Sequence, residues 1–294
     1  MTRSDGRVIG FDDVGDPHGV PVLFVHGTPD SRRARHPDDS LATRSGVRLV
    51  CIDRPGIGSS DDHPTRTVAS FADDAVALAD HLGVQQWRTF GWSAGSIYAL
   101  AVAARHPDRV AAAAVVAGLV PFEAYDTSDI LSSANGGRLM AAELGSELGA
   151  QAFAEMAAPM TAPYPCDHAL ALEHILEGAD PLRRRELAAV PGAAEAMADG
   201  VVDAVRRGLA AITRDLELQV EPPDVDWASV TCEVQLTYGG RDTTAPPEFA
   251  QWWQQSLTTT SLFVDPEAGH LVALTRWQEI LSDLRDAGGP ESFR

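Results

Sequence analysis

A chain of 294 residues, 45% of them hydrophobic, is long enough to bury a large core in one domain that carries an insertion. Its 42 acidic and 23 basic residues give a formal net charge of -19, which argues against nucleic acid and anionic membrane surfaces as partners. Every basic residue is arginine, so Schiff-base, Ser-Lys and P-loop mechanisms, which all need a lysine, are excluded.

The three cysteines, Cys51, Cys166 and Cys232, form neither a disulfide framework nor a metal-type spacing, so we expect a reducing compartment and no metal. The N-terminus is polar, and no apolar run that could act as a signal peptide follows it. No stretch approaches the ~18 apolar residues that a membrane span needs. These features predict a cytoplasmic protein that binds neither nucleic acid nor membrane.

In the first 119 residues, apolar strand patterns alternate with helical patterns. Most of the strands are continuous apolar runs, which are typical of strands buried on both faces of a parallel sheet. A helix is predicted over 68–82, where apolar residues recur at helical spacing. The predicted strands are 7–11, which ends in a turn over 12–17, then 21–26, 46–53, 87–90 and 110–116. This alternation indicates an α/β domain.

From about Val120 to about Pro223 the strand patterns disappear. Alanine and charged residues dominate there, and short helical stretches are interrupted by glycine and proline. We therefore divide the chain into a core, 1–119 and 224–294, and a helical insertion, 120–223. The core resumes with strands over 232–238 and 261–264, a helix over 246–257 between them, and a last helix that begins near His270.

The pentapeptide Gly91-Trp92-Ser93-Ala94-Gly95 fits the G-x-S-x-G nucleophile elbow, in which a sharp strand-to-helix turn exposes a serine hydroxyl at the sheet edge. The strand pattern over 87–90 precedes it, and an alanine-rich helical pattern over 96–104 follows it. So tight a turn leaves little room for side chains beside the serine, and glycine alone lacks a Cβ. The context is the one that the motif requires.

Together with four other segments, this elbow makes the chain resemble the α/β-hydrolase family, and within it the capped group with a Ser-Asp-His triad. The likeness covers nearly the whole chain, and its segments are 26–29, 53–60, 91–95, 239–242 and 268–270. The candidate residues occur in the order serine, acid, histidine that this fold uses. The resemblance implies a mostly parallel, eight-stranded sheet flanked by helices, with the insertion as a helical lid.

Three residues are candidates for the triad. Ser93 would be the nucleophile, and His270 would take its proton, since imidazole has a pKa near neutrality. Asp242, which follows a predicted strand on a Gly-Gly turn, would orient His270 and stabilise its protonated form. Some family members carry the acid after the preceding strand, which leaves Glu123 or Asp126 as the alternative.

Two backbone N–H groups are expected to form the oxyanion hole, one from Ala94 and one from the loop that begins at His26. Pro29 in that loop has no N–H, so Thr28 is the expected donor. The ring of His26 is expected to pack locally and do no chemistry. Gly56-Ile57-Gly58 resembles part of a dinucleotide-binding loop, but Asp61 stands where the third glycine would be, so we assign no cofactor.

The serine at the elbow disfavours epoxide hydrolases and haloalkane dehalogenases, which need a carboxylate nucleophile. Proline iminopeptidases share the capped layout but carry the elbow Gly-Gly-Ser-Trp-Gly, which differs from the pentapeptide here. We expect a serine hydrolase that cleaves an ester, lactone or thioester through an acyl-serine intermediate. The alternatives are a carbon–carbon bond hydrolase or cofactor-independent tailoring enzyme, and a catalytically silent ligand-binding protein on the same fold.

The expected partner is a small, largely apolar substrate. The candidate pocket walls are Trp92 and five residues of the insertion, namely Met140, Phe153, Met156, Met160 and Tyr164; the alternative is that they only attach the lid to the core. Trp252 and Trp253 are adjacent on one predicted helix and cannot both point the same way, so one of them could mark a contact in a homodimer.

Overall fold

A single sheet of seven strands forms the centre of the computed structural model, which describes residues 1–125 and 166–288 together with 145, 147–149, 151 and 155. The strands are β1 (Phe11–Gly15), β2 (Val20–Val25), β3 (Val47–Ile52), β4 (Trp87–Trp92), β5 (Val110–Val116), β6 (Glu233–Gly239) and β7 (Thr260–Asp265). Their spatial order is β1-β3-β2-β4-β5-β6-β7, and all neighbours are parallel except β1 and β3. The predicted α/β class and the mostly parallel sheet are confirmed.

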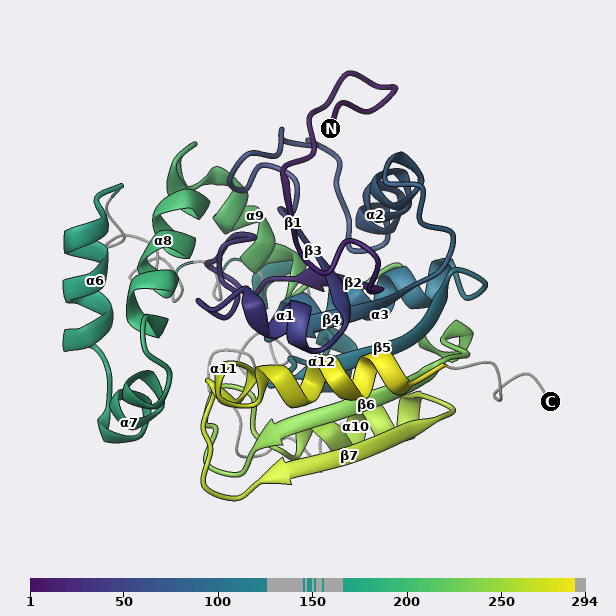
Figure 1. The fold of residues 1–294 in the computed structure, drawn as a ribbon. Coiled ribbons are helices and arrows are strands. Elements are labelled where there is room, and N and C mark those ends of the chain that lie inside the picture. Colours follow the sequence, from purple (N-terminus) through teal and green to yellow (C-terminus); the bar gives the residue numbers. More distant parts are fainter. Residues whose placement is uncertain (126–144, 146, 150, 152–154, 156–165, 289–294) are drawn as a thin grey trace.

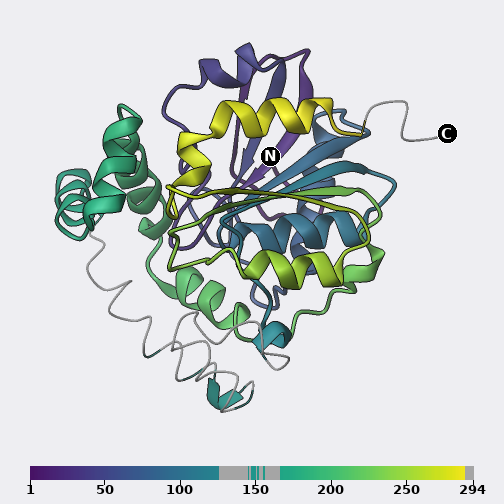
Figure 2. The same cartoon turned by 90° about the horizontal axis from the view of Figure 1, so that it is seen from below.

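Helices cover both faces of this sheet. The core helices are α1 (Ser40–Arg44), α2 (Ser70–His81), α3 (Gly95–Arg105), α10 (Phe249–Ser256), α11 (Val272–Thr275) and α12 (Trp277–Asp286). Helix α12 lies over one face, and α3 and α10 lie under the other (Figure 2). Trp277 of α12 packs on the central strands, with its ring 5.2 Å from that of Phe24 and 4.9 Å from that of Phe90. Among the described residues, no helix has both the length and the apolar character needed to cross a membrane.

The start of the chain differs from the prediction in two ways. The first strand lies over Phe11–Gly15, mostly in the segment predicted as a turn, and residues 7–10 contribute only a single bridge, between Val8 and Thr2. The backbone N–H groups of Val8 and Gly10 donate to the side chains of Asp61 and Ser60, so they are not available to a strand partner. The described sheet has seven strands, whereas the family resemblance implied eight.

The described part of the insertion is helical. Its elements are the short 3-10 helix η1 (Phe122–Tyr125), then α6 (His168–Glu177), α7 (Pro181–Ala189), α8 (Ala193–Val205) and α9 (Ala210–Leu218); a second 3-10 helix, η2 (Trp227–Ser229), follows it. Asp167 and Asp180 cap α6 and α7 by accepting backbone N–H groups of their first turns. In Figure 1, α6, α7 and α8 lie beyond the carboxyl ends of the strands, where active sites of α/β folds form.

Trp252 and Trp253 are both buried, so neither presents an exposed ring that could mark a contact in a homodimer. The ring of Trp253 lies 4.7 Å from that of Trp252 and 5.3 Å from that of Trp227 in η2, both edge to face. The indole N–H of Trp253 also donates to the carbonyl of Leu119 at 3.3 Å, and both tryptophans belong to the hydrophobic core. The homodimer stays a prediction without this support.

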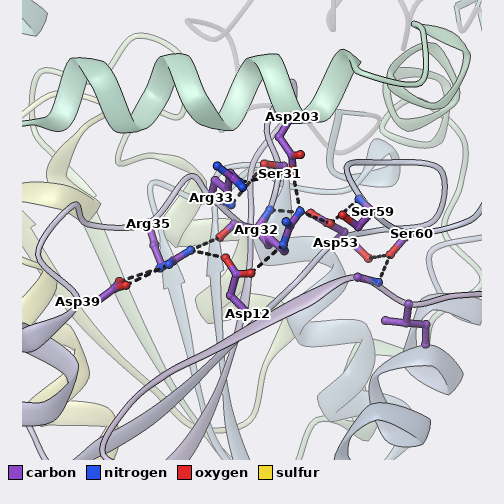
Figure 3. Close-up of polar contacts among 12 residues, drawn as sticks. Asp12, Ser31, Arg32, Arg33, Arg35, Asp39, Asp53, Ser59, Ser60 and Asp203 are labelled. Carbon is purple, nitrogen blue, oxygen red and sulfur yellow. Dashed lines mark hydrogen bonds and ion pairs between the residues drawn. The ribbon is translucent and has the colours of Figure 1, made fainter. Parts of the chain in front are cut away.

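A chain of ion pairs joins the core to helix α8 (Figure 3). The guanidinium of Arg32, in the loop after β2, lies 2.7 Å from Asp53, 2.5 Å from Asp203 of α8 and 3.0 Å from Asp12 of β1. Arg35 continues the chain from Asp12 to an aspartate before α1. Because Arg32 and Asp53 are buried, removal of either would leave a charge without its partner, which costs more than the pair itself gains.

Candidate active site

The nucleophile elbow is formed where β4 ends and α3 begins. Ser93, between them, has φ +54°, an uncommon value for a residue with a side chain and the one that lifts its hydroxyl out of the strand direction. The flanking glycines are required by space: a Cβ on Gly91 would lie 2.4 Å from the Cα of Ser96, and one on Gly95 would lie 2.1 Å from the carbonyl oxygen of Val25. The two glycines let strand and helix approach closely enough to make the turn.

The structure brings Ser93, His270 and Asp242 together from three separate strand ends. His270 Nε2 lies 3.1 Å from Ser93 Oγ, and His270 Nδ1 lies 2.7 Å from Asp242 Oδ2. The second carboxylate oxygen of Asp242 accepts the backbone N–H groups of Thr244 (2.8 Å) and Ala245 (3.0 Å). A carboxylate held in this way can only accept from the ring, so it places the proton on Nδ1 and leaves Nε2 free to accept the serine proton.

Neither alternative acid is brought to His270 by the described residues. Glu123, in η1, accepts the indole N–H of Trp227 at 2.7 Å. Asp126 lies outside the described residues. Asp242 is therefore the carboxylate that the described structure aligns with the histidine.

The loop after β2 passes directly beside Ser93. A Cβ on Gly27 would lie 3.2 Å from the Cβ of Ser93, so the backbone here comes as near to the nucleophile as side chains allow. The backbone N–H groups of Thr28 and Ala94 have no acceptor among the described residues. Two free N–H groups on the loop and at the start of α3 suit the stabilisation of a developing oxyanion.

His26 is buried, and its ring packs locally, as expected from the sequence. Its Nε2 accepts the backbone N–H of Arg54 at 3.3 Å, so Nδ1 carries the proton and donates to the carbonyl of Gly27 at 2.8 Å. Burial, together with the charge of Arg54, holds the pKa of His26 well below its ordinary value. The ring is neutral and holds the loop in place.

Arg54 is a fully buried cation beneath the same loop, and the sequence analysis missed its importance. Its guanidinium donates to the carbonyls of His26 and Gly27, to the hydroxyl of Thr28 at 2.8 Å, and to the carboxylate of Asp215 in α9 at 2.7 Å. Its position directly after a buried strand was the available signal, because a cation there needs an anion from elsewhere in the chain. The insertion supplies that anion, and the expected oxyanion loop rests on the pair.

Trp92 was expected to line the pocket. It is buried, and its indole N–H donates to the carbonyl of His270 at 3.2 Å, so it contacts the loop that carries the histidine. The other five candidate pocket residues, Met140, Phe153, Met156, Met160 and Tyr164, lie outside the described residues.

Asp30, two residues beyond Thr28, has an unusual environment. Its Oδ1 is buried without a hydrogen-bond partner among the described residues, and a Cβ on Gly200 of α8 would lie 2.5 Å from it. Burial raises the pKa of Asp30 to about 8, against the opposing charges of Arg183 and Arg54. The folded protein therefore keeps this carboxyl protonated at neutral pH.

We expect Asp30→Asn to remove a pH dependence of stability. Between about pH 4 and pH 8 the unfolded chain loses the proton and the folded chain keeps it, so the wild-type protein loses stability as pH rises through this window. Asparagine stays neutral in both states. The Tm of the variant minus the Tm of the wild type should increase from pH 4 to pH 8; a difference that stays constant would contradict the raised pKa.

Comparison with known proteins identifies the architecture. Residues 20–145 match the family model of the α/β-hydrolase fold. A proline iminopeptidase of Xylella fastidiosa is 35% identical over 114 residues, which is 36% of this chain and 34% of that protein. An esterase of Thermogutta terrifontis superposes with a TM-score of 0.65 at 20% identity, over 97% of this chain and 95% of that one.

A second solved structure, an enol-lactonase from Burkholderia xenovorans LB400, superposes with a TM-score of 0.64 at 17% identity, over 96% of each chain. The solved structures thus share the fold over nearly the whole chain. The matches with the curated relatives span about a third of the length of those proteins.

Proposed function

Because this chain belongs to the α/β-hydrolase fold, we propose that it is a serine hydrolase that cleaves the ester, lactone or thioester bond of a small, largely apolar substrate. The observation that carries the proposal is the alignment of Ser93 Oγ, the His270 ring and the Asp242 carboxylate at 3.1 and 2.7 Å. These distances allow proton transfer between serine and imidazole without a further movement of the ring.

In the first half of the proposed reaction, Ser93 Oγ attacks the carbonyl carbon of the substrate as its proton passes to His270 Nε2. The carbonyl π-bond opens, and the oxyanion accepts the backbone N–H groups of Thr28 and Ala94. Asp242 accepts a hydrogen bond from the Nδ1–H group and stabilises the imidazolium. The tetrahedral intermediate then collapses, the bond to the leaving alkoxide or thiolate breaks, and His270 Nε2 protonates it. Ser93 is left acylated.

In the second half, a water molecule gives its proton to His270 Nε2 and attacks the acyl carbon. The bond to Ser93 Oγ breaks, the carboxylic acid departs, and the proton returns from Nε2 to the serine. The reaction needs no group beyond the substrate, water and these residues.

Two of the solved neighbours are an esterase and an enol-lactonase, and this supports an ester or lactone substrate for the chain described here. The second candidate is an amide bond, which the relatives named proline iminopeptidase favour. The tryptophan of the elbow precedes the serine here and follows it in the Gly-Gly-Ser-Trp-Gly elbow of that family, so we place the ester first.

The test begins with a small serine-reactive organophosphonate, followed by intact mass and peptide mapping. We expect one adduct per chain, on Ser93. Initial rates with p-nitrophenyl butyrate, a γ-lactone, an acyl thioester and proline p-nitroanilide then separate the bond classes. Turnover of the anilide alone would select the amide candidate, and a chain that forms no adduct and cleaves none of these compounds would overturn the hydrolase proposal.

A further inference from the structure

Helix α7 of the insertion packs directly on the loop that carries His270. Leu182 and Glu186, one helical turn apart, both face Gly269, where a Cβ would lie 2.9 Å from Leu182 Cδ2 and 3.1 Å from Glu186 Oε2. A Cβ at position 269 would therefore press against both side chains, and glycine avoids this. The insertion reaches the residue next to the candidate base.

Glu186 is 5% exposed, and its carboxylate is directed at the backbone of this loop. Its Oε1 accepts the backbone N–H of Gly269 at 2.5 Å, and the backbone N–H of Leu271 interacts with the same carboxylate. The two N–H groups flank His270 on either side. Converging N–H groups of one loop bind an anion well, and they would be left unpaired without it.

The rest of the loop is fixed from other directions. Arg185 of α7 donates to the carbonyl of Glu267, and the backbone N–H of Arg241, in the turn before Asp242, donates to the carbonyl of Ala268 at 2.9 Å. The carbonyl of His270 itself accepts from Trp92. The histidine is thus held between the turn that carries the acid and a helix of the insertion.

Electrostatics connect Glu186 to the same pair. Burial raises the pKa of Glu186, and the charge of Asp242 acts in the same direction, while the two N–H groups and His270 oppose them. Asp242 and His270 are the titratable groups that face Glu186 from the turn and the loop, and Arg185 and Glu267 lie beside it on the exposed side. These interactions place the Glu186 carboxylate within electrostatic reach of both Asp242 and His270.

We propose that Glu186 is a positioning residue of the active site: its carboxylate fixes the backbone around His270 so that Nε2 stays within hydrogen-bond reach of Ser93. The inference rests on the proposed function. It assigns to an insertion helix a direct part in holding the base, in addition to any part in covering the substrate.

The experiment compares Glu186→Gln and Glu186→Ala with Glu173→Gln, which alters an exposed glutamate of α6 in the same insertion. For both Glu186 variants we expect kcat with p-nitrophenyl butyrate to fall by about 10- to 100-fold, because a misplacement of a catalytic group by about 1 Å costs this much. KM should change little.

Phosphonate titration counts the competent active sites and so corrects for unfolded protein. Glu186 variants whose titrated sites turn over at the wild-type rate would overturn the positioning role, even if their Tm falls, and would leave the proposed function in place. Failure of the wild-type protein itself to form an adduct on Ser93 is the separate result that removes the proposed function and this role together.

Discussion

Replacement of Ser93 by alanine is expected to lower kcat by at least about 10³-fold with any ester substrate, because the acyl-enzyme route then has no nucleophile. The fold should tolerate the change, since the substitution removes only one oxygen from a residue whose hydroxyl faces His270. Steady-state kinetics measure the loss, and intact mass shows whether the phosphonate adduct disappears. The residual rate reports what the free N–H groups of Thr28 and Ala94 contribute by binding alone.

Ser45→Ala is a matched control for this prediction. Ser45 is also a buried serine, but its hydroxyl contacts the carbonyl of Gln278 in α12 and no member of the triad. Its variant should keep both the adduct and the rate. Wild-type turnover by Ser93→Ala, with the same adduct at another residue, would contradict the acyl-serine mechanism.

Much of the fold and the alignment of the three triad candidates could be predicted because their signals are local. The elbow is five consecutive residues, and the acid and histidine each follow a strand whose apolar pattern is visible in the sequence. The first strand begins later than expected, at Phe11, because the N–H groups of Val8 and Gly10 are satisfied by the side chains of Asp61 and Ser60. No local sequence pattern indicates that these distant side chains pair with that backbone.

The residues that sequence analysis missed are those whose partners are distant in the chain. Arg54 and Asp215 are 161 positions apart, and Glu186 and Gly269 are 83 positions apart. Each of these contacts joins the insertion to a loop with a candidate catalytic role: Arg54 supports the oxyanion loop, and Glu186 supports the histidine loop. Helices α7 and α9 of the insertion therefore contact loops of the candidate site. An interpretation of 120–223 as a cover alone does not predict these contacts.

Replacement of Asp242 by asparagine is expected to lower kcat by about 10³- to 10⁴-fold with little change in Tm. The reason lies in the two backbone N–H groups of Thr244 and Ala245, which both donate to Oδ1. The amide of asparagine must place its oxygen there, because an NH₂ group would meet two donors. Its NH₂ group then faces His270 Nδ1, which has to act as the acceptor, so the ring proton moves to Nε2.

A histidine in that tautomer cannot accept the proton of Ser93. The variant should therefore be at least as slow as Asp242→Ala, in which both tautomers of the ring are accessible. The same kinetics on Asp283→Asn, an exposed aspartate of α12, control for the loss of one charge. Asp126→Asn tests the alternative acid. If Asp242→Asn were nearly silent while Asp126→Asn lost activity, the acid would be Asp126, and the 2.7 Å contact between Asp242 and His270 would serve only to orient the loop. Severe loss in Asp242→Asn that exceeds the loss in Asp242→Ala is the result that only the tautomer argument predicts.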